Sequence, residues 1–369
     1  MKTILIFSND HAYTYNFRKE IIEKLLSEGY KVYVALPYGE GIEKLKKMGC
    51  EFIEVSLNRR GKNPLQDLKL LWTYIKILKK IKPSIVLTYT LKPNLYGSIA
   101  SQIIKVPHIN NITGLGSAFL KDNLIKRTLL MIYKIALKKS DCVFFQNTSD
   151  LKFLKDNKIV KENAKLIPGS GVNLSEFIYS ELSNSEKIKF LYIGRIMKDK
   201  GIEEFLQAAT NIKKKFKNTE FEVLGYVEPT QKEYTQQLKD LHDNKIINYL
   251  GYQKNVKPII ENTHCIIQPS HGGEGISNVL LESGAMGKVL IASNIPGCRE
   301  TIDDKKNGFL FEPKDHLHLE KVIEKVLNLN FSQMKAMGAQ SRKKIEVEFD
   351  RTIVVNEYSK EINKITSKG

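Results

Sequence analysis

The sequence has little of what marks a membrane-spanning, secreted or zinc-binding protein. No apolar run reaches the ~18 residues that a membrane helix requires. The apolar stretch at residues 3–8 is too short for a signal peptide, so we interpret it as a first strand. The four cysteines are scattered without a Cys-x-x-Cys pair, and we expect reduced thiols in the core of a cytoplasmic protein.

Several catalytic motifs are also missing. His316-x-His318 has no cysteine near it, so the sequence predicts no metal site. Neither a Gly-x-Ser-x-Gly nucleophile turn nor a Walker phosphate loop occurs. These absences argue against zinc enzymes, hydrolases with that turn and P-loop nucleotidases, and we expect no cofactor.

Positive charge is abundant but unevenly distributed. The formal net charge is +17, with 29 Lys and Arg against 14 Asp and Glu in residues 1–175 but 29 against 27 in the remainder. The first half therefore suits an anionic surface or polymer. A lysine-rich solvated surface is the alternative, although such a bias is expected to act on both halves.

Apolar strands alternate with amphipathic helices along the chain, with one interruption. The polar, weakly periodic residues 171–187 separate two runs of this alternation. We therefore predict an α/β protein with two Rossmann-like domains, residues 1–175 and 176–351, each built on a doubly wound parallel sheet. Ligands bind at the carboxyl ends of such strands, so the active site is expected in a cleft that both domains face.

The densest group of chemically useful residues follows the apolar strand that begins at Cys265. This strand runs into His271-Gly-Gly-Glu274-Gly, and a helix is expected from about residue 278 to residue 286. Glycine lets the backbone approach a ligand closely, and Ser277 or Asn278 can cap the helix. The free N–H groups at the helix start then face an anion such as a diphosphate.

Two acidic residues frame this loop. Glu274 lies within it, and Glu282 lies about one turn inside the expected helix. A carboxylate accepts two hydrogen bonds side by side, so each suits a pair of neighbouring hydroxyls, one pair on a sugar and one on a ribose. The simpler alternative is an ordinary strand–loop–helix connection with a surface acid and a helix acid.

Glu274 and Glu282, with seven residues between them, resemble the paired-glutamate signature of retaining glycosyltransferase family 4, which has the GT-B fold. A second block, Tyr192-Ile-Gly-Arg195-Ile-Met-Lys-Asp-Lys200-Gly201, is similar to the family's Gly-Arg-x-x-x-x-Lys-Gly loop. The motifs stand in the family's order, and the resemblance covers nearly the whole chain. It implies two Rossmann-like domains, with a C-terminal helix of residues 352–369 packed back on the first.

The resemblance implies a metal-independent transferase in which Glu274, Arg195 and Lys200 carry the chemistry. Arg195 and Lys200 would hold the donor diphosphate, Glu274 the donor sugar and Glu282 the ribose. The other expected donor contacts are Gly194, Gly225, Tyr252, His271, Gly273, Gly275, Ile276, Ser277, Asn278 and Val279. A surface position for His271 and simple packing for Tyr252 remain alternatives. The absence of Asp-x-Asp argues against a metal-dependent GT-A transferase.

Polar loops after three predicted strands of the first domain are the expected acceptor site. The expected contacts are Asn9, Asp10, His11, Lys92, Asn94, Thr113, Gly114, Gly116 and Ser117. Asp10 and His11, in an expected loop of residues 8–16, are a possible acid–base pair, and the alternative is a helix-capping Asp beside an exposed His. Many family members have His-Gly where this chain has Thr113-Gly114, so no catalytic His is carried over, and His108 is interpreted as structural.

Two basic-apolar segments, residues 58–82 and 119–139, lie in the first domain. Basic amphipathic helices bind anionic lipid surfaces, whereas core helices with solvated lysines are the alternative. The Gly-Leu-Gly-Ser form at residues 114–117 resembles the subgroup that extends polyprenyl-diphosphate-linked sugars. We therefore expect a peripheral protein on the anionic inner face of the cell membrane.

The sequence and the resemblance together predict a hexosyltransferase. It would move a sugar, N-acetylhexosamine in the first instance, from a UDP-sugar to a polyprenyl-diphosphate-linked sugar in surface-polysaccharide or glycan assembly. One alternative is a UDP-N-acetylglucosamine 2-epimerase of the same fold, which needs no acceptor. The other is a non-catalytic nucleic-acid-binding protein, suggested by a pI of about 9.4. Because no nucleic-acid module is recognisable, we expect no nucleic-acid partner.

Overall fold

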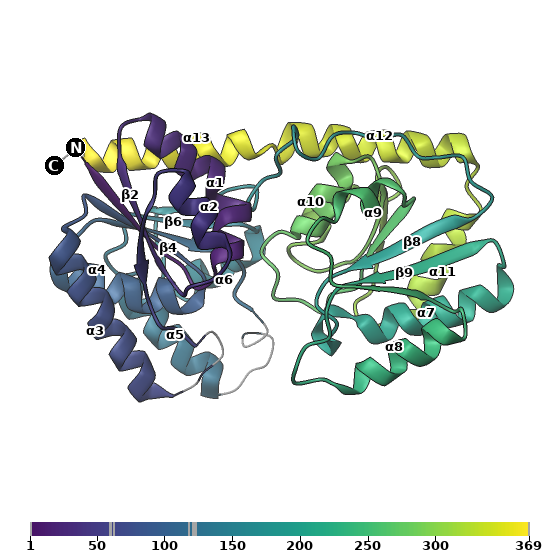
Figure 1. Cartoon of the computed structure of the whole chain (residues 1–369), viewed down its shortest axis with the longest axis horizontal. Helices are drawn as coiled ribbons and strands as arrows, with labels where there is room; N and C mark the ends of the chain where they lie inside the picture. The colour runs from purple at the N-terminus through teal and green to yellow at the C-terminus, as the bar shows by residue number, and fades with distance from the viewer. Residues whose placement is uncertain (1, 59–60, 62, 117–118, 120–123, 368–369) are drawn as a thin grey trace. The chain divides into compact units, whose positions relative to one another are not determined.

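The computed structural model describes residues 2–58, 61, 63–116, 119 and 124–367, and it divides into two compact units. Unit 1 comprises Met1–Gly171 together with Arg351–Gly369, and unit 2 comprises Val172–Asp350. The divisions thus fall at 171/172 and 350/351, where the sequence suggested 175/176 and 351/352. In Figure 1 the colour of the chain runs through unit 1, then unit 2, and returns to unit 1 with its last helix.

Unit 1 contains a seven-stranded parallel sheet with the order β3-β2-β1-β4-β5-β6-β7. Its strands are β1 (Thr3–Phe7), β2 (Lys31–Leu36), β3 (Glu51–Glu54), β4 (Ile85–Tyr89), β5 (His108–Ile112), β6 (Cys142–Phe145) and β7 (Ala164–Leu166). Successive side chains of a strand point to opposite faces, so each strand contributes to two cores. Ile4 and Ile6 of β1 pack on one side, and Leu5 and Phe7 pack on the other.

Helices cover both faces of this sheet. One face carries α1 (His11–Ser27), α2 (Gly41–Lys47) and α13 (Arg351–Thr366). The other carries α3 (Pro64–Ile81), the π-helical turn η1 (Pro93–Gly97), α4 (Ser98–Ile104), α5 (Leu124–Ala136) and α6 (Thr148–Asp156). Figure 1 shows α3, α4 and α5 gathered together, and α4 packs on both α3 and α5.

The start of α1 was predicted wrongly. The sequence suggested a helix from residue 18, but α1 begins at His11, where the Asp10 side chain accepts a hydrogen bond from the Tyr13 N–H at 2.7 Å. The buried face of the first turns carries Thr14 and Arg18, so polar residues stand where an amphipathic pattern has apolar ones. The first loop therefore spans only residues 8–10, and His11 belongs to a helix.

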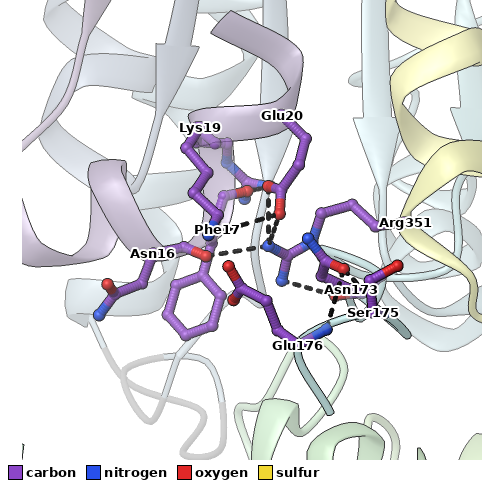
Figure 2. A network of polar contacts seen from close by, with 10 residues as sticks. Asn16, Phe17, Lys19, Glu20, Asn173, Ser175, Glu176 and Arg351 are labelled. Atoms are coloured by element: carbon purple, nitrogen blue, oxygen red, sulfur yellow. Dashed lines mark hydrogen bonds and ion pairs between the residues drawn. The ribbon is translucent and has the colours of Figure 1, made fainter. Parts of the chain in front are cut away.

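The last helix, α13, is held on unit 1 by a buried arginine at its start. Arg351 donates hydrogen bonds to the Glu20 carboxylate at 2.8 and 2.9 Å and to the Asn16 carbonyl oxygen at 3.0 Å, as Figure 2 shows. Further along α13, Val354, Tyr358 and Ile362 join the core beneath α1. Because an unpaired buried charge is costly, these contacts fix where α13 begins to pack.

Unit 2 contains a six-stranded parallel sheet with the order β10-β9-β8-β11-β12-β13. Its strands are β8 (Ile188–Ile193), β9 (Thr219–Leu224), β10 (Asn248–Gly251), β11 (Cys265–Gln268), β12 (Val289–Ser293) and β13 (Gly308–Phe311). The sequence predicts the third of these strands at residues 246–249, two residues before the observed β10. The pairing of β10 with β9 shifts register between Tyr249 and Gly251, an irregularity that alternation of apolar residues does not reveal.

The helices of unit 2 also form two layers. One layer consists of α7 (Ile202–Lys215), α8 (Glu233–Asp243) and α11 (His316–Leu327), and the other of α9 (Lys257–Glu261) and α10 (Asn278–Ala285), with α12 (Phe331–Glu348) packed on α10. Short 3-10 turns, η3 (Lys198–Lys200) and η4 (Arg299–Thr301), lie in loops. The predicted α/β fold with two Rossmann-like parallel-sheet units is confirmed.

Two expectations about composition can also be compared with the structure. All four cysteines are buried and unpaired, as expected of core thiols. Within the described ranges, no helix combines the length and apolar character needed to cross a bilayer.

Candidate active site at the carboxyl edges of the sheets

The strand order of unit 2 places its switch point between β8 and β11, where the direction of strand addition reverses. The loops that leave the carboxyl ends of these two strands hold Arg195 and Lys200 on one side and His271 and Glu274 on the other. Ligands of doubly wound sheets bind at such a switch point. The two motifs singled out in the sequence therefore meet at one place within unit 2.

Close backbone approaches join these loops to their neighbours. Gly201 has φ +75°, and a Cβ atom there would lie 1.9 Å from the Pro269 carbonyl oxygen. At Gly225, after β9, a Cβ atom would lie 1.8 Å from the carbonyl oxygen of Gly194. Only glycine fits either position. Gly225, which the sequence suggested as a nucleoside contact, therefore packs against the Gly194 carbonyl group where the two strands end.

Glu274 is the centre of a polar cluster. Its Oε1 atom forms an ion pair with Lys200 Nζ and accepts a hydrogen bond from the Ser270 hydroxyl at 2.9 Å. Burial opposes ionisation of this carboxyl, but the Lys200 charge, the Ser270 hydroxyl and Arg195 outweigh it, so the pKa of Glu274 lies below its ordinary value. Glu274 is therefore an anion at neutral pH.

Arg195 lies beside an acid that the sequence analysis did not identify. Its guanidinium contacts the Glu228 carboxylate at 3.1 Å, and Glu228 is buried just beyond β9. The Arg195 carbonyl oxygen accepts a hydrogen bond from the Tyr192 hydroxyl at 2.8 Å. The Arg195 side chain is about one-third exposed, and a guanidinium has five N–H donors, more than one carboxylate contact uses. The only signal for Glu228 in the sequence was an acid soon after a strand, which is too common to be specific.

His271 is neither a surface residue nor directed to solvent. Its side chain is 6% exposed, and Nε2 lies 3.0 Å from Glu204 Oε1 in the first turn of α7. The His271 N–H also donates to the Asp199 carbonyl oxygen at 3.0 Å. Burial raises the pKa of Glu204, but the His271 hydrogen bond and nearby positive charge lower it further, to a net value below the ordinary one. His271 thus connects the loop after β11 to η3 and α7. The sequence analysis did not identify Glu204, because acidic residues are common in the first turn of helices.

The start of α10 matches the expected anion-binding geometry. The Ser277 side chain accepts from the Leu280 N–H and caps the helix, which settles the choice between Ser277 and Asn278. Gly273 has φ +76° in the preceding loop, and the Ser277 N–H donates to the Gly297 carbonyl oxygen at 2.8 Å. The remaining residues of this stretch lie in order along the loop and the first turns of α10, namely Gly275, Ile276, Asn278, Val279 and Glu282.

Tyr252 follows β10 on the same edge of the sheet. It is 63% exposed, and its ring meets the half-exposed ring of Tyr226 edge to face, with centroids 6.1 Å apart. Simple core packing is therefore excluded for Tyr252. Tyr226, which follows β9, was not identified from the sequence. Two exposed rings after neighbouring strands offer a surface for a flat base.

In unit 1, Asp10 and His11 each accept a hydrogen bond at the start of a helix. Asp10 caps α1, and His11 Nδ1 accepts a hydrogen bond from the Gly41 N–H at 3.1 Å at the start of α2. The His11 ring packs so closely on Gly39 that a Cβ atom there would lie 1.9 Å from Nε2. Both side chains therefore organise helix starts, and His11 is packed where the alternative reading had it exposed.

Two other expected acceptor residues of unit 1, Asn94 and Lys92, are buried in contacts within that unit. Asn94 is buried and bonds to the Thr88 hydroxyl at 2.6 Å and to the Asn111 carbonyl oxygen at 2.7 Å, so its amide holds strands together. Lys92 pairs with Asp67 at 2.6 Å and lines a pocket of about 390 Å³. Asn94 thus serves the fold, and the buried Lys92 is held by its ion pair at the wall of this pocket.

The loop after β5 contains two glycines, Gly114 and Gly116, so part of its backbone is not covered by side chains of its own. Thr113 and Gly114 are the first two residues after β5. The space beside Gly116 is open, since a Cβ atom there would meet nothing within 4 Å. Ser117 lies outside the described residues. His108, at the start of β5, is buried against Ser140, and burial lowers its pKa. The structural role predicted for His108 is therefore confirmed.

Family models match both units. The model described as "Glycosyl transferase 4-like" matches residues 3–147, and the model described as "Glycosyl transferases group 1" matches residues 175–344. Together they account for most of the chain. The chain is a family 4 glycosyltransferase. The fold, the paired glutamates and the Arg195–Gly201 loop thus belong to an enzyme of this family, as the resemblance implied.

Two curated relatives of this glycosyltransferase are bacterial enzymes named as glycosyltransferases. It is 27% identical over 375 residues to the N,N'-diacetylbacillosaminyl-diphospho-undecaprenol alpha-1,3-N-acetylgalactosaminyltransferase of Campylobacter jejuni, with 96% of each chain covered. It is also 27% identical over 350 residues to the capsular polysaccharide biosynthesis glycosyltransferase CapM of Staphylococcus aureus, with 91% of this chain and 90% of the relative covered.

Solved glycosyltransferase structures share the fold at lower identity. Anabaena Alr3699/HepE, solved in complex with UDP, superposes on the family 4 glycosyltransferase described here with a TM-score of 0.80 at 15% identity. The match covers 99% of this chain and 100% of that one. At this identity the likeness concerns the fold alone.

No metal centre is found in the part of the glycosyltransferase that the structure describes. Over those residues, no group of three or more His, Cys, Asp or Glu side chains is arranged to hold an ion. Arg195 and Lys200 carry positive charge in the loop after β8, and N–H groups at the start of a helix such as α10 favour anions.

Proposed function

We propose that this glycosyltransferase moves a sugar, N-acetylhexosamine in the first instance, from a UDP-sugar to a polyprenyl-diphosphate-linked sugar, with retention of anomeric configuration and without a metal ion. The observation that carries the donor half of this proposal is the Lys200–Glu274–Ser270 cluster at the β8/β11 switch point. Such a cluster places a mobile cation and an ionised carboxylate within contact of each other, next to a capped helix start.

The donor would exchange partners with this cluster. A diphosphate carries more negative charge than one carboxylate, so Lys200 is drawn from Glu274 toward the diphosphate, with Arg195 and the α10 N–H groups beside it. The freed Glu274 carboxylate then accepts hydrogen bonds from the donor sugar. Glu282, about one turn into α10, takes the ribose hydroxyls, and Tyr252 with Tyr226 flanks the base.

In the transfer step, the bond between the anomeric carbon and the diphosphate oxygen breaks as negative charge develops on the leaving group. Arg195 and Lys200 stabilise that charge, which lowers the barrier more than uniform binding of the substrate would. The acceptor hydroxyl oxygen forms the new bond on the same face, and its proton passes to the departing diphosphate. No side-chain base is assigned.

The acceptor class is supported by the relatives and by charge. The Campylobacter jejuni relative is named for an undecaprenyl-diphosphate-linked substrate, and the excess of positive charge lies in residues 1–175. In unit 1, α3 exposes Leu65, Leu68 and Trp72, and α5 exposes Leu124, Met131 and Ile135. The accompanying basic residues include Lys76, Lys79, Lys126, Arg127 and Lys134. Arg59, Arg60, Lys62 and residues 120–123 of the same segments lie outside the described residues.

We propose that these two helices dock on the anionic inner face of the cell membrane. They lie on the same face of the unit 1 sheet, each packed on α4, and each pairs an exposed apolar stripe with lysines. The double variant Leu68→Glu/Trp72→Glu should lose most co-sedimentation with anionic vesicles, while Leu317→Glu, an exposed apolar residue of α11 in unit 2, should retain it. Binding that ignores salt, anionic lipid and the double variant would refute docking by this face.

The experiment that tests the proposed reaction measures UDP release from a panel of UDP-sugars, with and without a polyprenyl-diphosphate-linked sugar, for the wild type and Glu274→Ala. The proposal predicts acceptor-dependent release from one donor and its loss in the variant. Conversion of UDP-N-acetylglucosamine without acceptor would instead indicate an epimerase. If UDP is not released and no UDP-sugar binds, both the transferase and the epimerase are excluded.

A further inference from the structure

Thr90, the first residue after β4, has a strained backbone. Its φ is +72°, a left-handed conformation that β-branched residues rarely adopt because the side chain crowds the backbone. Among the described residues, the other non-glycine positions with positive φ are all lysines, at helix ends and turns: Lys82, Lys105, Lys158, Lys245, Lys305 and Lys314. Thr90 alone of this set combines branching with a position at the carboxyl end of a strand.

Two buried polar atoms at this place have no partner. Over the described part of the chain, neither Thr90 Oγ1 nor Asn9 Oδ1 makes a hydrogen bond. Buried polar atoms are nearly always bonded, so each exception requires an explanation. Asp10 and His11, which follow Asn9, by contrast accept hydrogen bonds at the starts of α1 and α2.

The two residues are neighbours by topology. β1 and β4 pair in parallel up to Phe7 and Thr88, and Asn9 and Thr90 each stand two residues beyond that last pair. This is the switch point of unit 1, because strands are added on either side of β1 and β4 in opposite directions. The helix after Thr90 also contains the π-helical turn η1, a form that occurs mostly at functional sites.

We propose that Asn9 and Thr90 form the subsite of unit 1 that holds the terminal sugar of the acceptor. This inference rests on the proposed function and names the part of the acceptor recognised. An amide and a hydroxyl are uncharged and both donate and accept, so they match sugar hydroxyl or acetamido groups better than a diphosphate. The strain at Thr90 is then the cost of holding its hydroxyl toward the ligand.

The test compares Thr90→Gly, Asn9→Ala and a control, Lys105→Gly, at the end of the same helical segment. Both glycine variants relieve a positive φ, so both should raise the melting temperature by roughly 2–4 °C. Only Thr90→Gly and Asn9→Ala should raise the KM for the polyprenyl-diphosphate-linked sugar, by about tenfold, which corresponds to one lost hydrogen bond. UDP affinity should be unchanged in all three.

An unchanged acceptor KM in Thr90→Gly and Asn9→Ala would overturn the inference while leaving the proposed function intact. Equal loss of UDP affinity and melting temperature in Thr90→Gly would overturn it as well, since Thr90 would then be structural. If the wild type shows no acceptor-dependent UDP release, the proposed function fails first and this subsite fails with it. A Thr90→Ser variant that restores the acceptor KM would support the hydroxyl as the contact.

Discussion

The carboxyl edges of the two sheets differ in chemistry although their topology is alike. At the β8/β11 edge of unit 2 the predicted residues lie close together, and Lys200–Glu274 and Arg195–Glu228 form ion pairs. At the β1/β4 edge of unit 1, Asp10 and His11 accept hydrogen bonds at helix starts, and two buried neutral groups of the described residues, at Asn9 and Thr90, have no hydrogen-bond partner. The first edge suits a diphosphate, and the second suits a sugar.

This contrast explains why one site could be predicted and the other could not. A nucleoside diphosphate imposes the same demands wherever it binds, namely cations, a glycine-rich loop and a helix start, and these leave a motif in the sequence. A sugar acceptor is recognised by uncharged groups whose spacing varies. Such groups become visible only when the structure shows a strained backbone or an unbonded polar atom.

The largest expected effect concerns Glu274. Glu274→Gln keeps the shape of the side chain but cannot remain an anion beside Lys200, so kcat should fall by about 10²–10³. The measurement is steady-state UDP release at saturating acceptor. A drop of the same size in Asn9→Ala would erase the contrast between the two edges.

Arg195→Lys should have the next largest effect on turnover. Lysine keeps the positive charge but loses the planar fork of donors, so turnover should fall by roughly 10–100-fold, and Arg195→Ala should fall further. Glu228→Gln serves as the control because it keeps a hydrogen-bond acceptor beside Arg195. Full activity in Arg195→Lys would mean that simple charge suffices at this edge.

Glu204 should have an intermediate effect, through position rather than contact. Glu204→Ala removes the partner of His271, so the loop that carries Glu274 is less well fixed and kcat should fall by about 5–20-fold. Glu204→Gln should recover part of the loss. Glu203→Ala is the matched control in the same helical turn, where the carboxylate contacts Lys198 and Tyr234 instead. Equal losses in both variants would show a general effect on α7.

Lys288 should affect stability and not activity, because it lies at the opposite, amino-terminal edge of the unit 2 sheet. Burial lowers its pKa to about 8. The unfolded chain binds this proton up to about pH 10.5, so stability rises with pH between those values. Lys288→Met should therefore be more stable by roughly 1–3 kcal/mol at pH 7, with the gain disappearing near pH 10.5. Denaturant unfolding of both proteins across this pH range tests the sign of the stability difference. Turnover at pH 7 is the control.

The sequence predicted most of the fold because its apolar residues follow the strand and helix periods closely. The sequence predicts strands at residues 31–36, 108–112, 188–193 and 308–311, and the structure has strands with the same bounds. The start of α1 was missed because Thr14 and Arg18 occupy its buried face, and β10 was displaced by a register shift. In the site, Glu204 and Glu228 were missed because a lone acid near a strand or helix end carries no specific signal. The roles of Asp10, His11 and Asn94 depended on which backbone groups they meet, which no local pattern encodes.

Calorimetric titration with UDP alone tests the central claim most directly, because it needs no acceptor. We predict that the wild type binds UDP, that Lys200→Ala binds it about tenfold or more weakly, and that Thr90→Gly binds it as the wild type does. Unchanged affinity in Lys200→Ala would contradict a donor site at the β8/β11 edge. Weakened affinity in Thr90→Gly would contradict the assignment of the two edges to two different substrates.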